Sequence, residues 1–114
     1  MTRTFIQTDM FTKQWDSLGL TDEDMYCLEQ EILRNPKIGP VVPGTGRLRK
    51  IRIATGNKGK RGGIRVCYVD FVIWDTIYLF SVYAKNEKEN LSRVECNNIK
   101  KAINELEKNL AKEV

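Results

Sequence analysis

Histidine is absent from this chain of 114 residues. Its absence removes the commonest general acid–base, every Ser–His or Cys–His catalytic pair and the usual zinc ligand. Any catalysis must therefore depend on lysine, arginine, tyrosine, aspartate or glutamate. The cysteines form no CxxC pair, so the chain also lacks the spacing of a zinc site. We predict neither a metal nor a cofactor.

Long apolar runs and targeting signals are missing as well. The longest strongly apolar stretch, 66–82, is interrupted by Asp70 and Asp75 and favours strands over a membrane span. The chain begins without the features of a signal peptide. The odd set of cysteines, Cys27, Cys67 and Cys96, is typical of reduced core residues. These features predict a cytoplasmic protein that does not contact a membrane.

The glycine-rich segments match no nucleotide-binding motif. Gly44-Thr45-Gly46 lacks the third glycine of a dinucleotide fingerprint. The segment 56–61 lacks both the spacing and the Ser/Thr of a P-loop. The sequence therefore predicts no nucleotide-dependent chemistry.

Acidic residues are absent between Glu31 and Asp70. Residues 1–31 carry a net charge of −5 (2 basic, 7 acidic), residues 32–69 carry +10, and residues 70–114 carry −1 (7 basic, 8 acidic). So concentrated a positive field favours a nucleic acid or an acidic protein as partner, bound in a salt-dependent way. The alternative is a solvated basic face with no dedicated ligand.

The pattern predicts one α+β domain spanning residues 1–114. We expect strands over 4–8, 48–55, 64–73 and 77–84. Helices are expected over 11–18, from Thr21 to the Asn35-Pro36 stop, and after a capping box formed by Ser92 and Glu95. We predict an antiparallel sheet of about four strands with the helices packed on one face.

Strand periodicity divides the basic residues between two faces. Ile51 and Ile53 point one way and Lys50 and Arg52 the other. Arg65 lies on the next strand.

Tyr83 and Lys85 share one parity on the last strand, so all five polar residues could converge on one surface. The alternatives are an ion pair of Arg65 with Asp70 or with a helical acid, and a half-buried strand position for Tyr83. Further basic residues could bind a nucleic acid around this surface, namely Arg47, Arg49, Lys58, Lys60 and Arg61.

Three sequence blocks, 44–53, 59–68 and 82–88, resemble toxins of the RelE/ParE superfamily, and most closely the HigB-like branch of the RelE family. The resemblance implies a microbial-RNase-like α+β domain. It also implies a ribosome-dependent endonuclease that cleaves translated mRNA without a metal. The implied partners are the ribosome with its mRNA, a cognate antitoxin protein, and operator DNA only as the toxin–antitoxin complex.

The resemblance also assigns site residues. The basic strand pair of the family falls on Lys50 and Arg52, its strand arginine on Arg65, and the lysine after its last strand on Lys85. Asn86 stands where better-known RelE members have an arginine, and no tyrosine occurs over 87–92. Tyr83 is the candidate for that aromatic role. These residues form the predicted catalytic set.

Two other classes of function remain open. A ParE-like gyrase poison would share the fold, but that branch generally lacks clustered basic residues on the sheet. A non-catalytic nucleic-acid-binding module would be expected to interleave aromatic residues with basic ones. Residues 47–65 contain no aromatic residue.

Overall fold

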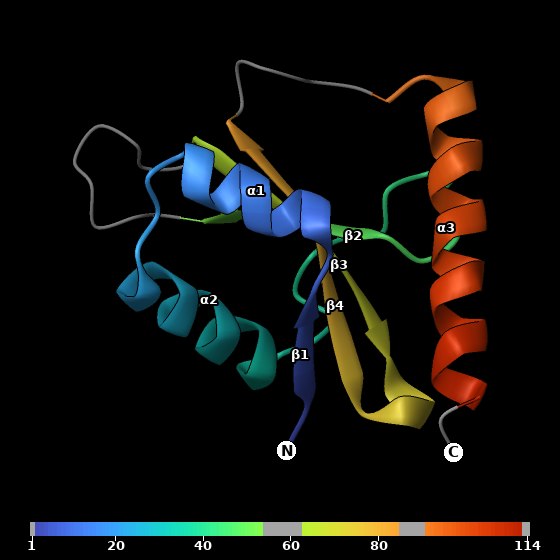
Figure 1. The fold of residues 1–114 in the computed structure, drawn as a ribbon, viewed down its shortest axis with the longest axis horizontal. Helices are drawn as coiled ribbons and strands as arrows, with labels where there is room; N and C mark the ends of the chain where they lie inside the picture. Colours follow the sequence, from blue (N-terminus) through green and yellow to red (C-terminus); the bar gives the residue numbers. More distant parts are fainter. Residues whose placement is uncertain (1, 54–62, 85–90, 113–114) are drawn as a thin grey trace.

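The computed structural model describes residues 2–53, 63–84 and 91–112 (Figure 1). Within these ranges it contains four strands, three α-helices and one short 3₁₀ helix. The elements are β1 (Thr4–Gln7), α1 (Asp9–Ser17), α2 (Asp22–Arg34), β2 (Arg49–Ile53), β3 (Ile64–Phe71), η1 (Val72–Trp74), β4 (Thr76–Ala84) and α3 (Arg93–Lys112). The predicted α+β class and the four strands are confirmed. None of the helices described is long and apolar enough to cross a membrane.

Side-chain caps begin each of the three α-helices described. The Thr8 hydroxyl caps α1, and Thr21 and Asp24 form a reciprocal capping box at α2. At α3 the Ser92 N–H donates to Glu95 Oε1 at 2.9 Å, and the Glu95 N–H donates to Ser92 Oγ at 3.1 Å. These bonds satisfy N–H groups that have no partner inside the helix. The predicted capping box at Ser92 is therefore confirmed.

The strand order in the sheet is β1-β4-β3-β2. β2, β3 and β4 pair antiparallel, as expected, but β1 pairs parallel with β4. The predicted antiparallel arrangement therefore holds for β2, β3 and β4, and the parallel pairing of β1 corrects it. A parallel pair needs a long connection between its strands. Here α1, α2, β2 and β3 lie between β1 and β4 in the chain.

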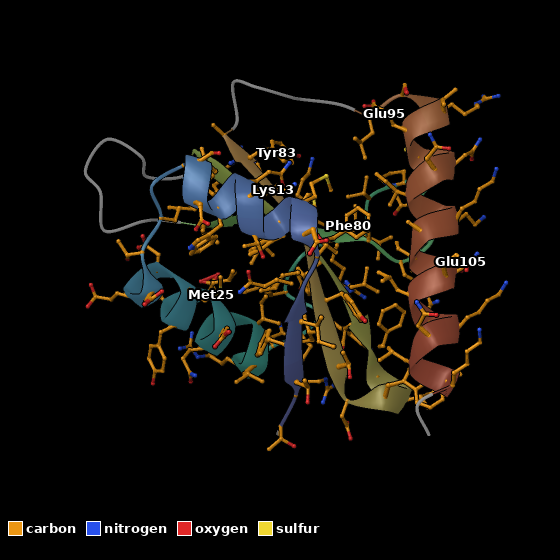
Figure 2. All side chains as sticks on the ribbon, viewed as in Figure 1. Lys13, Met25, Phe80, Tyr83, Glu95 and Glu105 are labelled. Atoms are coloured by element: carbon orange, nitrogen blue, oxygen red, sulfur yellow. The ribbon has the colours of Figure 1, made fainter. Side chains whose placement is uncertain are left out.

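The helices cover both faces of the sheet, which corrects the prediction that they pack on one face (Figure 1). On one face α1 and α2 bury Phe11 and Ile32 against Val66 and Tyr68 of β3, and Met25 packs at the margin of this core (Figure 2). On the other face α3 packs a second core against the strands. The buried residues of this second core are Leu48, Cys67, Val69, Phe71, Phe80, Ile103 and Leu110. Alternate residues of β3 thus enter different cores, because the strand is apolar on both sides.

Two smaller expectations also change. Cys27 is exposed, whereas Cys67 and Cys96 are buried as predicted. Cys27 is exposed because the buried residues of α2 are Leu28 and Ile32. The strand expected to reach residue 73 ends at Phe71, and η1 begins at the next residue, Val72.

Candidate nucleic-acid interface

Strand register brings three of the predicted site residues into one row. Arg65 of β3 lies directly opposite Arg52 of β2 and directly opposite Tyr83 of β4. Opposed residues of antiparallel strands project from the same face. Lys50 shares this face, because it lies two residues from Arg52 on the same strand. We call Lys50, Arg52, Arg65 and Tyr83 the basic platform.

The platform lies on the sheet face that α3 covers only in part. The second core, beneath α3, uses Val69 and Phe71 of β3, which lie further along the strand than Arg65. Arg52 is exposed, and Lys50, Arg65 and Tyr83 are half-buried. The cationic residues are therefore at least partly accessible, while their backbones are held in the sheet.

The connection before β2 holds this edge strand in place. The Lys50 N–H donates to the Pro40 carbonyl at 3.1 Å, and the Arg49 guanidinium donates to the Gly39 carbonyl at 2.8 Å. A Cβ at position 39 would come within 2.5 Å of Ile51 Cγ2 and 2.8 Å of the Lys50 carbonyl oxygen. Glycine is therefore required here, because the connection runs so close to the platform strand.

Tyr68 fastens the same connection from the core side. Its buried hydroxyl donates to the Pro36 carbonyl at 2.8 Å and accepts from the Gly39 N–H at 3.2 Å. Burial raises the pKa of the Tyr68 phenol above its ordinary value. The hydroxyl thus stays neutral and able to donate at physiological pH.

Two of the predicted RNA-binding arginines contact other parts of the protein. Arg47 makes two bonds to Glu107 of α3, at 2.6 and 3.3 Å, and its guanidinium lies 5.0 Å from the centre of the Phe71 ring. The hydrogen bond from Arg47 holds the pKa of Glu107 below its usual range. Arg49 has the parity of Ile51 and projects from the face opposite Lys50. The structure does not bring these two arginines to the platform.

Four of the predicted residues have no described position. Lys58, Lys60, Arg61 and Lys85 lie outside the described residues. Asp70, the alternative ion-pair partner of Arg65, accepts a hydrogen bond from Arg3 Nε at 3.0 Å.

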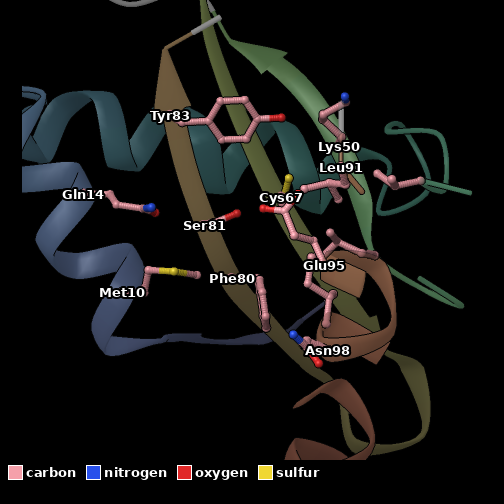
Figure 3. A pocket seen from close by; sticks show the side chains of 13 residues that line it. Met10, Gln14, Lys50, Cys67, Phe80, Ser81, Tyr83, Leu91, Glu95 and Asn98 are labelled. Atoms are coloured by element: carbon pink, nitrogen blue, oxygen red, sulfur yellow. The ribbon is translucent and has the colours of Figure 1, made fainter. Parts of the chain in front are cut away.

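A cavity of about 450 Å³ adjoins the platform between the sheet, α1 and α3 (Figure 3). Lys50 and Tyr83 belong both to its lining and to the platform. The remaining lining residues are Met10, Gln14, Val42, Leu48, Cys67, Phe80, Ser81, Leu91, Glu95, Asn98 and Ile99.

Sequence reasoning missed this cavity. The parity of Cys67 and Ser81 with Arg65 and Tyr83 could have placed those two residues on the site face. Nothing in the sequence indicated that Gln14 of α1 and Asn98 of α3 would line the same cavity.

Cys67 is a poor candidate for a nucleophile. Burial raises the pKa of its thiol, and this effect outweighs the lowering by the Ser81 hydrogen bond, the Lys50 charge and the Tyr83 hydrogen bond. The thiolate is the reactive form of cysteine, so a raised pKa leaves the thiol inert at neutral pH.

A second cavity of about 310 Å³ lies at the β2 edge, and its lining includes Glu31, Lys50, Arg52 and Arg65. The platform therefore has a hollow on either side. Two guanidinium groups and an ammonium group between hollows can bind the phosphates of an extended chain. In the ranges described, no group of histidine, cysteine, aspartate or glutamate side chains could hold a metal ion.

No family model matches the sequence. Solved structures of the E. coli toxin RelE have a similar fold. A mutant RelE in the free state aligns with a TM-score of 0.56 at 18% identity, over 78% of this chain and 90% of that one. The isolated RelE toxin gives 0.55 at 18% identity, over 89% and 99%.

A RelE mutant in complex with an antitoxin RelBc peptide gives a TM-score of 0.53 at 19% identity, over 80% of this chain and 100% of that one. At such identities the likeness establishes the fold. The RelE-like fold expected from the sequence blocks is thereby confirmed.

Proposed function

We propose that this protein is the toxin of a type II toxin–antitoxin system, in the HigB-like branch of the RelE family. In this proposal the domain of residues 1–114 is a metal-independent, ribosome-dependent endoribonuclease that cleaves translated mRNA and inhibits translation. The observation that carries the proposal is the row of Arg52, Arg65 and Tyr83, with Lys50 on the same face, on a RelE-like fold.

RNA carries its own nucleophile, which explains how a site without histidine could cleave it. The 2′-hydroxyl loses its proton and attacks the adjacent phosphorus. The bond from phosphorus to the 5′-oxygen then breaks, and that oxygen takes up a proton. The products are a 2′,3′-cyclic phosphate and a 5′-hydroxyl. The protein needs only to position the strand, stabilise the phosphorane and assist two proton transfers.

The platform offers side chains for each of these tasks. The planar forks of Arg65 and Arg52 can each bind two phosphorane oxygens and stabilise the charge that develops there. Lys50 of the platform and Lys85, which lies outside the described residues, are the candidates for the proton transfers. The Tyr83 ring can stack on a base and its hydroxyl can bind a phosphate. The ribosome supplies the geometry of the mRNA over these groups.

We propose that a cognate antitoxin covers the basic platform or the adjoining helices in resting cells. One structural neighbour is RelE in complex with an antitoxin peptide, and the net positive charge of residues 32–69 would attract an acidic partner. The pair would bind operator DNA as a complex in the cytoplasm. Co-purification with the product of the neighbouring gene supports this. A lone chain that is harmless on expression contradicts it.

The decisive experiment is to induce the protein and to map mRNA 5′ ends with and without translation. We expect new 5′ ends within translated codons that disappear when initiation is blocked. Equal cleavage of naked RNA would contradict ribosome dependence. Growth arrest with intact mRNA and inhibited gyrase would indicate a ParE-like poison, and RNA binding without cleavage would indicate a non-catalytic module.

A further inference from the structure

The cavity beside the platform is placed to receive part of a nucleotide. Lys50 and Tyr83 lie on its boundary with the platform. A phosphate bound there would have its own base within reach of the cavity. The volume of about 450 Å³ is within the usual range for small-molecule sites. Its walls include Leu48, Phe80 and Ile99, which suit the faces of an aromatic ring.

One side of the cavity presents a fixed hydrogen-bond donor. Gln14 lines the cavity from α1, and its Oε1 accepts from the Val82 backbone N–H at 2.9 Å. This bond fixes the orientation of the amide group, whose NH₂ then serves as the donor (Figure 3). Ser81 and Lys50 line the cavity as well and can also donate.

The opposite side presents acceptors from α3. Glu95 and Asn98 are three residues apart, so they project from neighbouring positions of one helical face, and both line the cavity. The capping bond with Ser92 limits the orientations of the Glu95 carboxylate. A carboxylate can accept about four hydrogen bonds, and the capping bond from the Ser92 N–H uses one of them.

We propose that this cavity holds one nucleobase of the substrate, and that Gln14, Glu95 and Asn98 select a base with an exocyclic amino group over uracil. Ring nitrogens or carbonyl oxygens of the base meet the donors, and the amino group meets the α3 acceptors. Adenine, cytosine and guanine carry such an amino group, whereas uracil lacks one. The inference rests on the proposed function in taking RNA as the ligand.

Binding of mononucleotides to the purified full-length chain tests the cavity directly. We would titrate GMP against IMP and CMP against UMP, following the side-chain amide signals of Gln14 and Asn98 by NMR. The amino-bearing member of each pair should bind about five- to tenfold more tightly, as expected for one net hydrogen bond. Both amide signals should shift on binding.

Variants on α3 make this test specific. Asn98→Ala and Glu95→Gln should remove the discrimination within each pair. Glutamine can replace glutamate in a capping box, so the second variant keeps the helix start. Asn97→Ala is the matched control, because Asn97 is exposed on the same helix, as Asn98 is, but is not among the residues lining the cavity. It should leave the discrimination unchanged.

Failure of this inference is distinguishable from failure of the proposed function. Equal affinity within both pairs, or amide signals that do not shift, overturns the cavity assignment even if mRNA is cleaved. Discrimination that Asn98→Ala abolishes supports the assignment even if no mRNA is cleaved, in which case only the toxin function is lost. If the chain both discriminates between bases and cleaves mRNA, the mapped 5′ ends should show a bias against uracil at one position. Asn98→Ala should remove that bias.

Discussion

Among the platform residues, Arg65 has the best-held backbone, because strands pair with β3 on both sides of it. Its guanidinium should therefore be the best-preorganised donor for phosphorane charge. We expect Arg65→Ala to lower cleavage on saturating ribosome complexes about a hundred- to thousandfold, equivalent to about 2.7–4 kcal/mol. Arg34→Ala is the matched control, since Arg34 is exposed at the end of α2, which packs on the other face. It should cleave like the parent.

The melting temperature separates a catalytic from a structural role. If Arg65→Ala stays folded and cleaves within about threefold of the parent, the loss is far smaller than that of one such donor. The assignment would then be wrong, and Lys85 would become the leading candidate.

Tyr68 gives a prediction about stability rather than activity. Tyr68→Phe leaves the Gly39 N–H and the Pro36 carbonyl without their buried partner. We expect the free energy of unfolding to fall by about 1–3 kcal/mol, the cost of stranded polar groups. Tyr26→Phe is the control, because Tyr26 is 63% exposed, and it should be nearly neutral. Equal denaturant midpoints for the two variants would contradict the role of the hydroxyl.

At this scale the sequence predicted well the sheet face from which strand side chains project, and it predicted individual partners poorly. The alternation of Lys50 and Arg52 with apolar residues was enough to place both on the site face, because side chains in a strand have a period of two. The contacts of Arg47 and Arg49 could not be predicted from the sequence. Glu107 is 60 residues from Arg47 in the chain, and the approach of Gly39 to β2 depends on tertiary packing.

Between elements, the Arg47–Glu107 pair joins α3 to the segment preceding β2. The pKa of Glu107 is lowered in the folded protein, first of all by its hydrogen bond from Arg47. A lowered folded-state pKa means that the pair stabilises the fold above the unfolded-state pKa and ceases to do so as pH falls through the folded-state value. At neutral pH we expect Glu107→Gln to cost about 0.2–1 kcal/mol, as for a partly exposed pair.

The measurement is the free energy of unfolding of parent and variant from neutral to acid pH. The difference should vanish at the acid end, below the ordinary glutamate value of 4.5. Glu105→Gln is the control. It removes an i,i+3 pair with Lys108 whose side chains are 68% and 69% exposed, and it should change stability less. A difference for Glu107→Gln that stays constant into acid would refute the role of its charge.

Helix boundaries were predictable from local chemistry, whereas the assembly of the elements was not. Thr21 and the Ser92–Glu95 box determine helix starts through bonds made within four residues. The parallel pairing of β1 and the packing of α3 on the second face depend on contacts distant in sequence. The apolar run 66–69 was the available signal for the second face, because a strand buried on both sides need not alternate.

Over the whole molecule, charge is distributed asymmetrically across the sheet. All seven acidic residues of 1–31 lie on α1 or α2. These helices pack on one face and the basic platform lies on the other, although Glu31 also lines the β2-edge cavity with Arg52 and Arg65. Apart from Glu31, this arrangement would orient an incoming polyanion toward the platform and away from the acidic helices.

The salt dependence of RNA binding tests which of the positive charges take part. On a single strand, log affinity falls linearly with log salt, and each side chain that neutralises a phosphate makes the slope steeper by about 0.7. We expect Lys50→Ala and Arg52→Ala each to reduce that slope by about this amount on a single-stranded RNA oligonucleotide. Arg49→Ala should leave it nearly unchanged, because that guanidinium lies on the opposite face and donates to the Gly39 carbonyl. A slope that falls equally for Arg49→Ala and Arg52→Ala would show that RNA responds to the total charge of the segment 32–69 rather than to the platform.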